Sequence, residues 1–125
     1  MAKIRIISEI GVNHNGNIRL AKKMIDLSKK AGADYVKFQM FKTENLITKE
    51  ANKTKYQIKN TNKKQSAFNM LKSLELNKSQ IKLLYKYALK KNIKFLTTPF
   101  DFDSVNELYN LGIKEVKISS GDIDN

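Results

Sequence analysis

The chain has 125 residues, a net charge of +12 and no cysteine. This length allows one domain at most, and the lack of cysteine excludes a disulfide framework, a thiolate metal site and a cysteine nucleophile. No apolar run approaches the roughly 20 residues of a membrane helix, and residues 1–16 turn polar too soon for a signal peptide. These features predict a soluble protein of the cytoplasm.

The positive charge raises the alternative of a basic nucleic-acid-binding module. Of the 24 basic residues, however, only Arg5 and Arg19 are arginines, the residue best suited to bidentate contacts with phosphates and bases. The lysines are spread over predicted helix faces and one loop. Nucleic-acid binding therefore stays an alternative that the sequence does not favour.

The first predicted strand is Lys3 to Ser8, where isoleucines supply β-branched bulk. The polar loop "GVNHNG" follows it. Asn17 is the predicted N-cap of a helix that Gly32 closes. The second predicted strand is Tyr35 to Phe38.

Residues 41–64 are rich in lysine and only weakly periodic, which predicts a long loop with a short helix near Lys53 to Lys59. The apolar periodicity then predicts a short helix over Ala67 to Leu74. A longer helix is predicted to begin after the cap Asn77 and to end at Asn92.

The third predicted strand is Ile93 to Thr97, and the sequence "TTPF" after it is predicted as a loop. Asp101 or Asp103 caps the next helix, which Gly112 closes. The fourth predicted strand is Val116 to Ile118.

Short apolar strands that alternate with amphipathic helices predict a parallel α/β sheet. Two architectures fit this order, an open doubly wound sheet and a (β/α)8 TIM barrel. The loop "GVNHNG" lacks the spacing of a glycine-rich dinucleotide fingerprint, which favours the barrel. Because a barrel takes about 250 residues, the four predicted strands would form its first half.

Lysines interrupt two of the predicted strands. Lys37 and Lys117 each follow a valine and each stand five residues after a glycine. Period-two alternation places Lys37 with Gln39 on one face, and Lys117 with Ser119 on one face. Functional groups of parallel α/β folds collect at the carboxyl ends of the strands, where these residues lie.

Two lysines that converge in one cavity would repel each other, and each would be driven toward its neutral form. A dianionic phosphate bound between them removes this repulsion. The hydroxyls of Thr98 and Ser120 and the backbone amides of "SSG" could complete its binding site. The pattern therefore predicts an anion site. Three alternatives stay open: a lysine that reaches water at a strand end, a lysine paired with a glutamate, and a Schiff-base lysine.

Glu9 follows the first predicted strand and is a candidate general acid or base. A structural role as the partner of one of the lysines fits the sequence equally well. His14 is the only histidine and lies in a polar loop, which favours a hydrogen-bonding role over catalysis. One histidine does not make a metal site by itself.

Four motifs, "EIGVNHNG", "AGADYVKFQ", "FLTTPFD" and "KISSGD", occur in this order along the chain. Together they resemble the sialic acid synthase family over residues 7–125. The resemblance implies a (β/α)8 barrel followed by a small antifreeze-protein-like domain. It also implies that residues 1–125 are the N-terminal part of the barrel, with the second half and the antifreeze-like domain absent from this chain.

The implied activity is the condensation of phosphoenolpyruvate with an N-acetylated hexosamine such as N-acetylmannosamine. The products would be N-acetylneuraminate or a related nine-carbon acid, and phosphate. By motif match, the resemblance implies a catalytic role for Glu9, phosphoenolpyruvate binding by Lys37, Thr98, Lys117 and Ser120, and pocket positions for Gln39 and Asp122.

The resemblance further implies a divalent metal, usually manganese, held by two histidines from the second half of the barrel, and a full-length homodimer. Residues 1–125 alone are therefore expected to be inactive. Many bacterial members carry glutamate where this chain has Asp122, and "VKFQMFK" resembles the branch that includes legionaminic acid synthases. The remaining alternative is an inactive half-barrel with only a structural role.

Overall fold

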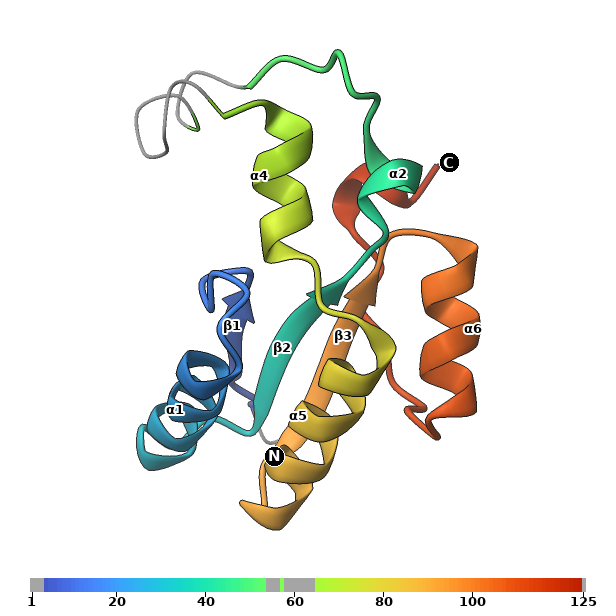
Figure 1. The fold of residues 1–125 in the computed structure, drawn as a ribbon. Helices are drawn as coiled ribbons and strands as arrows, with labels where there is room; N and C mark the ends of the chain where they lie inside the picture. The colour runs from blue at the N-terminus through green and yellow to red at the C-terminus, as the bar shows by residue number, and fades with distance from the viewer. Residues whose placement is uncertain (1–3, 54–56, 58–64, 125) are drawn as a thin grey trace.

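The computed structural model describes residues 4–53, 57 and 65–124. Three strands, β1 (Ile7–Gly11), β2 (Tyr35–Met40) and β3 (Lys94–Pro99), lie side by side in chain order and form one sheet (Figure 1). Both pairs are parallel. The predicted parallel sheet of alternating strands and helices is therefore confirmed.

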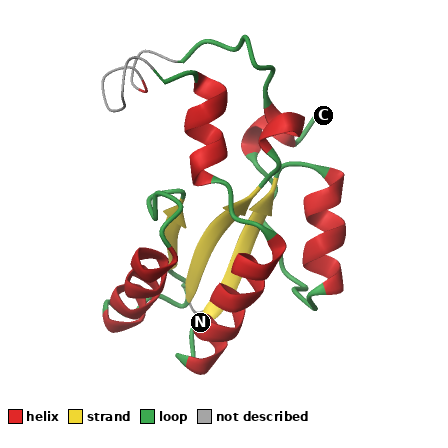
Figure 2. Ribbon diagram, viewed as in Figure 1, coloured by secondary structure: helices red, strands yellow, loops and turns green. Residues whose placement is uncertain are grey.

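Figure 2 shows the helices beside these strands. They are α1 (Ile18–Lys30), α2 (Thr43–Leu46), α4 (Ala67–Leu74), α5 (Lys78–Lys90), α6 (Phe102–Asn110) and the short 3-10 helix η1 (Ser120–Asp122). The side chains of Asn17, Asn77 and Asp101 accept hydrogen bonds from backbone amides in the first turns of α1, α5 and α6. These predicted caps are confirmed, and of the two candidates before α6 the cap is Asp101.

The hydrophobic core lies between one face of the sheet and the helices. Val36, Phe38 and Met40 of β2 pack there with apolar residues of α1 and α5, such as Ile25 and Leu84. Every second residue of β2 takes part, as the alternation of side chains along a strand requires. The opposite face of the sheet is thus free of these helices, and we call it the inner face.

The predicted first strand, Lys3 to Ser8, was wrong at both ends, because β1 begins at Ile7 and continues to Gly11. Ile7 is the partner of Tyr35, where β2 begins, so earlier residues have no strand beside them. Ile4 and Ile6 are accordingly exposed. Lys3 lies outside the described residues.

The second and third strands run two residues further than predicted. Met40 pairs with Pro99 at their ends, and the amide of Phe100 still donates to the Met40 carbonyl at 3.1 Å. Proline is tolerated at this place because β3 is an edge strand of the described sheet. Thr98 and Pro99, which were predicted to lie in the "TTPF" loop, therefore belong to β3.

The fourth predicted strand, Val116 to Ile118, was wrong as an element. Val116 forms a single parallel bridge with Thr97, and the Lys117 amide donates to the Thr97 carbonyl at 2.9 Å. Within the described residues no strand borders this segment on its other side, and Ile118 is exposed. The pairing of this segment with β3 therefore stops after one bridge.

The stretch predicted as one long loop contains the short helix α2. The helix predicted near Lys53 to Lys59 lies almost entirely outside the described residues. In the part of the chain that is described, no helix is both long and apolar enough to cross a membrane.

Two glycines with positive φ provide a matched test of the packing between the loop after β1 and α4. A methyl group at Gly16 (φ +71°) would collide with the backbone carbonyl of Ser73, whereas one at Gly32 (φ +86°) would meet no atom within 4 Å. We expect Gly32→Ala to lower the free energy of unfolding by about 1–2 kcal/mol, from backbone strain alone. Gly16→Ala should cost about 2–4 kcal/mol, because overpacking adds to this strain. Urea unfolding measures both, and equal losses would contradict the close approach at Ser73.

Candidate active site

Residues from β1 and β2 meet on the inner face near the carboxyl ends of the strands. Lys37 and Gln39 alternate with the core residues of β2 and therefore point away from the helices. Lys37 lies directly opposite Glu9 of β1 in the strand register, and Gln39 lies opposite Thr98 of β3. Residues that are register partners in neighbouring parallel strands point to the same face of the sheet. Four of the predicted site residues thus occupy one surface.

The Lys37 ammonium is buried and forms an ion pair with Glu9. Its Nζ lies 3.1 Å from Oε1 of Glu9, and the exposed fractions of the two side chains are 6% and 66%. A buried ammonium is costly without a counter-charge, and Glu9 supplies it. Of the alternatives that the sequence left open, the pairing of a lysine with a glutamate is therefore present in this structure.

Thr98 brings a hydroxyl to the same surface. Thr98 is only 1% exposed, and its Oγ1 has no hydrogen-bond partner among the described residues. Buried hydroxyls are nearly always hydrogen-bonded in folded proteins. The Thr98 hydroxyl is therefore a polar group that a bound ligand or water could satisfy.

Lys117 joins the inner face from the last segment. Val116 is the bridge partner of Thr97, whose side chain points to the helices, so the next residue, Lys117, is turned the opposite way. Lys117 is a half-buried residue, and its ammonium forms no ion pair with any other residue that the structure describes. The bridge thus places both predicted lysines on one face of the sheet.

Ser120 and Asp122 lie in η1, directly beyond Lys117. Ser120 is exposed and Asp122 is half-buried. One of the "SSG" amides predicted to bind an anion is already used within this turn, because the Gly121 amide donates to Oγ of Ser119 at 3.3 Å. The amide of the next residue, Asp122, donates to the Ser119 carbonyl at 3.0 Å. The side-chain hydroxyl of Ser120 is thus the better candidate donor from this segment.

Asp101 has a second role that the sequence did not reveal. Its Oδ1 accepts from the Ser104 amide at 2.7 Å as the cap of α6, and its Oδ2 accepts from the Lys42 amide at 3.0 Å. One carboxylate therefore ties the end of β2 to the end of β3. A hydrogen bond from Lys42 to Asp103 at 3.2 Å reinforces this link and is the main cause of the raised pKa of Lys42.

Glu75 holds α2 against α4 at the same end of the sheet. Its Oε2 accepts from both the amide and the hydroxyl of Thr43, at 3.0 and 2.9 Å. The Lys72 ammonium bridges Glu75 and Glu44 at 3.1 and 3.0 Å. Lys72 and Glu75 are only three positions apart, but no local pattern signals the contacts of Glu75 with Thr43 and of Lys72 with Glu44, whose partners are 32 and 28 positions apart.

His14 is fully buried, and its ring centroid lies 6.0 Å from that of Phe38, a residue on the helix-covered face of the sheet. Its Nδ1 accepts a hydrogen bond from the Gly16 amide at 3.0 Å. Burial lowers the pKa of His14, and a backbone hydrogen bond with Gly11 opposes this shift only in part. The histidine is therefore neutral at pH 7 and shapes the loop, which is the hydrogen-bonding role that the sequence favours.

The described residues do not fit a metal ion. They contain no group of three or more histidine, cysteine, aspartate and glutamate side chains that could hold one. His14 is unsuited as well, because its Nδ1 is engaged and its Nε2 is buried.

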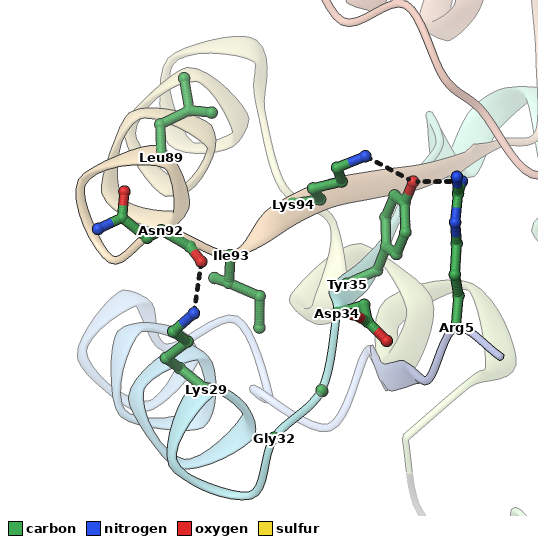
Figure 3. A pocket seen from close by; sticks show the side chains of 10 residues that line it. Arg5, Lys29, Gly32, Asp34, Tyr35, Leu89, Asn92, Ile93 and Lys94 are labelled. Carbon is green, nitrogen blue, oxygen red and sulfur yellow. Dashed lines mark hydrogen bonds between the residues drawn. The ribbon is translucent and has the colours of Figure 1, made fainter. Parts of the chain in front are cut away.

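A cavity of about 600 Å³ lies at the opposite, amino end of the strands (Figure 3). The hydroxyl of Tyr35 at its wall accepts hydrogen bonds from Arg5 at 3.2 Å and Lys94 at 3.3 Å, and donates to Glu115 at 3.0 Å. Polar groups at this end of a parallel barrel usually stabilise the fold, whereas chemistry takes place at the carboxyl end. A second cavity, of about 470 Å³, lies at the carboxyl end and includes Asp101 and Asp122 in its wall.

The geometry can be compared with known proteins. A model of the NeuB family matches residues 24–125. The chain belongs to the NeuB family. It is 50% identical over 125 residues to an N,N'-diacetyllegionaminic acid synthase of Campylobacter jejuni. The alignment covers 100% of this chain and 37% of that protein. A synthase of the same name from Legionella pneumophila is 44% identical over 120 residues, 96% of this chain and 34% of that protein.

A solved structure has the same fold as this chain. It is the N-acetylneuraminic acid (sialic acid) synthetase of Leptospira borgpetersenii in complex with citrate, with a TM-score of 0.82 and 35% identity over 98% of this chain and 38% of that chain. The predicted architecture, the first part of a (β/α)8 barrel, is confirmed. The chain spans little more than a third of the length of these relatives.

The buried His14 predicts a specific dependence of stability on pH. Its pKa is lowered by burial from its usual value of about 6.5, so the unfolded chain binds more protons below that pH. Stability from this group is therefore present above about pH 6.5 and is lost as the pH falls. We expect the urea midpoint to drop between pH 7.5 and 5.5, and to drop less in His14→Gln. Equal drops in both proteins would show that His14 is not held neutral.

Proposed function

We propose that the full-length protein is a nonulosonic acid synthase, which condenses phosphoenolpyruvate with an N-acetylated amino sugar to give a nine-carbon acid and phosphate. The observation that carries the proposal is the inner face itself. There the buried Lys37 ammonium stands on the strand next to the Thr98 hydroxyl, which has no hydrogen-bond partner among the described residues. Membership of the NeuB family and the names of the relatives support it.

In this proposal the inner face binds phosphoenolpyruvate as an anion. The ammonium groups of Lys37 and Lys117 neutralise its phosphate or carboxylate, and the hydroxyls of Thr98 and Ser120 donate hydrogen bonds to the same oxygens. The citrate complex of the Leptospira relative shows that this relative binds a polyanion, which supports an anion site in the family.

Gln39 and Asp122 are the proposed contacts for the sugar. An amide and a carboxylate together can donate to and accept from sugar hydroxyls. Two relatives at 50% and 44% identity are named for a diacetylated acid, N,N'-diacetyllegionaminic acid. We therefore favour a diacetamido sugar as the acceptor over N-acetylmannosamine.

The proposed reaction forms one carbon–carbon bond. Carbon 3 of phosphoenolpyruvate attacks the aldehyde carbon of the open-chain sugar, and the aldehyde oxygen takes up a proton to become a hydroxyl. Water adds to carbon 2, its protons pass to a base, and the bond from carbon 2 to the phosphate oxygen breaks to leave a ketone and inorganic phosphate. Glu9 is the proposed acid or base for these proton transfers, because its exposed carboxylate lies beside the anion site.

Further parts of the proposal concern the protein beyond these residues. Residues 1–125 would form the N-terminal part of the synthase barrel in a cytoplasmic homodimer, with the second half of the barrel and an antifreeze-like domain supplied elsewhere. A divalent metal, manganese, belongs to the proposal as well, with ligands outside the described residues. The competing proposal of nucleic-acid binding is weakened, because the ammonium groups of Lys42, Lys72 and Lys91 each pair with a carboxylate. These three pairs lie in different parts of the fold.

Lys37→Met tests the anion site in the full-length protein. Loss of a charge-assisted hydrogen bond costs about 1.5–3 kcal/mol, so phosphoenolpyruvate should bind about tenfold to a hundredfold more weakly. Isothermal titration calorimetry measures this affinity. Lys42→Met is the matched control, because this lysine lies beyond the end of the same strand but pairs with Asp103. Equal affinities of the Lys37 variant and the wild type would refute the anion site.

Glu9→Gln tests the proposed chemical role. Turnover should fall by about a hundredfold or more, the usual contribution of a general acid or base, with no matching loss of substrate affinity. The assay measures phosphate released from phosphoenolpyruvate with a diacetamido sugar or N-acetylmannosamine, in the presence of manganese. If the glutamine variant keeps wild-type turnover, Glu9 is only a structural carboxylate.

A further inference from the structure

The ion pair of the inner face joins two side chains in very different surroundings. Lys37 is 6% exposed, whereas Glu9, 3.1 Å away, is 66% exposed. Among the described residues no other carboxylate pairs with the Lys37 ammonium. The buried cation therefore depends on a counter-charge that stands largely in water.

This asymmetry makes Glu9 a replaceable partner. A buried ammonium loses much of its hydration and needs an anion next to it. An exposed carboxylate that turns away is fully hydrated again, so the cost of separating the pair falls on the buried ammonium, whose charge the incoming anion then balances. The regular pairing of β1 with β2 is also interrupted between Glu9 and Gly11, directly after the glutamate. Interruptions of this kind re-aim side chains next to functional sites.

The pairing of Glu9 with Lys37 leaves another polar group of the inner face without a hydrogen bond. The Thr98 hydroxyl, one strand over on the same face, is buried and has no partner in the described part of the chain. Glu9 has no hydrogen bond to it. A phosphate has oxygens on several sides, so it can accept from Lys37 and Thr98 at once and satisfy both groups.

We propose that Glu9 is the resting counter-ion of Lys37 and that an incoming phosphate or carboxylate anion displaces it. This inference rests on the proposed anion site. It gives Glu9 two successive positions, one paired with Lys37 before the anion binds and one released from it afterwards. The carboxylate thus becomes free for proton transfer only when the first substrate is in place.

The inference predicts whether the removal of Glu9 strengthens or weakens the binding of an anion. If Glu9 serves only to orient Lys37, its removal weakens anion binding. If Glu9 competes with the anion, its removal strengthens binding, because the anion no longer displaces a carboxylate and the buried ammonium has lost its other counter-charge.

The experiment titrates the full-length protein with inorganic phosphate, and separately with phosphoenolpyruvate, by isothermal titration calorimetry. Glu9→Gln and Glu9→Ala should both bind phosphate about threefold to tenfold more tightly than the wild type. Both variants leave the Lys37 ammonium without its counter-charge and should be less stable than the wild type, so a cooperative melting transition is checked in each before the titration. Asp103→Asn is the control for net charge: it removes one negative charge from an exposed pair with Lys42 at the same end of the sheet, and its affinity should stay within about twofold.

A second measurement follows the melting temperature. Phosphate should raise the Tm of Glu9→Gln by more than it raises the Tm of the wild type, because a tighter ligand stabilises the folded state more. Unchanged or weaker phosphate binding by both Glu9 variants would overturn the competition. If Lys37→Met still loses phosphate binding in that case, the anion site itself stands. Equal binding by Lys37→Met and the wild type would overturn both the site and the inference.

Discussion

The burial of one charge, the Lys37 ammonium, constrains the rest of the structure. Its side chain is 6% exposed in the middle of a strand that also contains Gln39 but carries no other charge, and Glu9 on the neighbouring strand compensates it. A shift of the register by one residue would turn Lys37 into the helix-covered core and bring Val36 and Phe38 to the inner face. Such a shift would bury an unpaired ammonium and expose two large apolar side chains at once. The strand register, the core and the candidate site therefore depend on the same alternation along β2.

Precise placement of the site also depends on contacts outside it. The inner-face residues Gln39 and Thr98 lie three positions before Lys42 and Asp101, and the latter two are joined by a hydrogen bond of 3.0 Å. Because the Asp101 carboxylate also caps α6, a movement of that helix would be transmitted to the ends of both strands. Supporting contacts of this kind hold functional groups at the separation that a ligand requires.

The sequence predicted what is encoded locally. Caps such as Asn17 and Asn77 and the alternation along β2 were read correctly, because each depends on residues a few positions apart. The start of β1 and the loss of the fourth strand depend on which segments lie alongside, which no local pattern contains. For the same reason the pairing of Glu9 with Lys37 stayed one of several alternatives until the register was known. The link from Asp101 to Lys42 spans 59 positions and was not anticipated.

The Glu9–Lys37 pair connects stability with binding. A phosphate that binds the Lys37 ammonium has to replace an interaction that already stabilises the folded chain, and this exchange lowers the net gain in affinity. For the proposed synthase the arrangement is still favourable, because a permanently unpaired ammonium would destabilise the protein whenever substrate is absent. The partner that serves this need is the exposed one, whose release costs least. The same carboxylate is the proposed acid or base, so the group that leaves the lysine is already next to the substrate that displaced it.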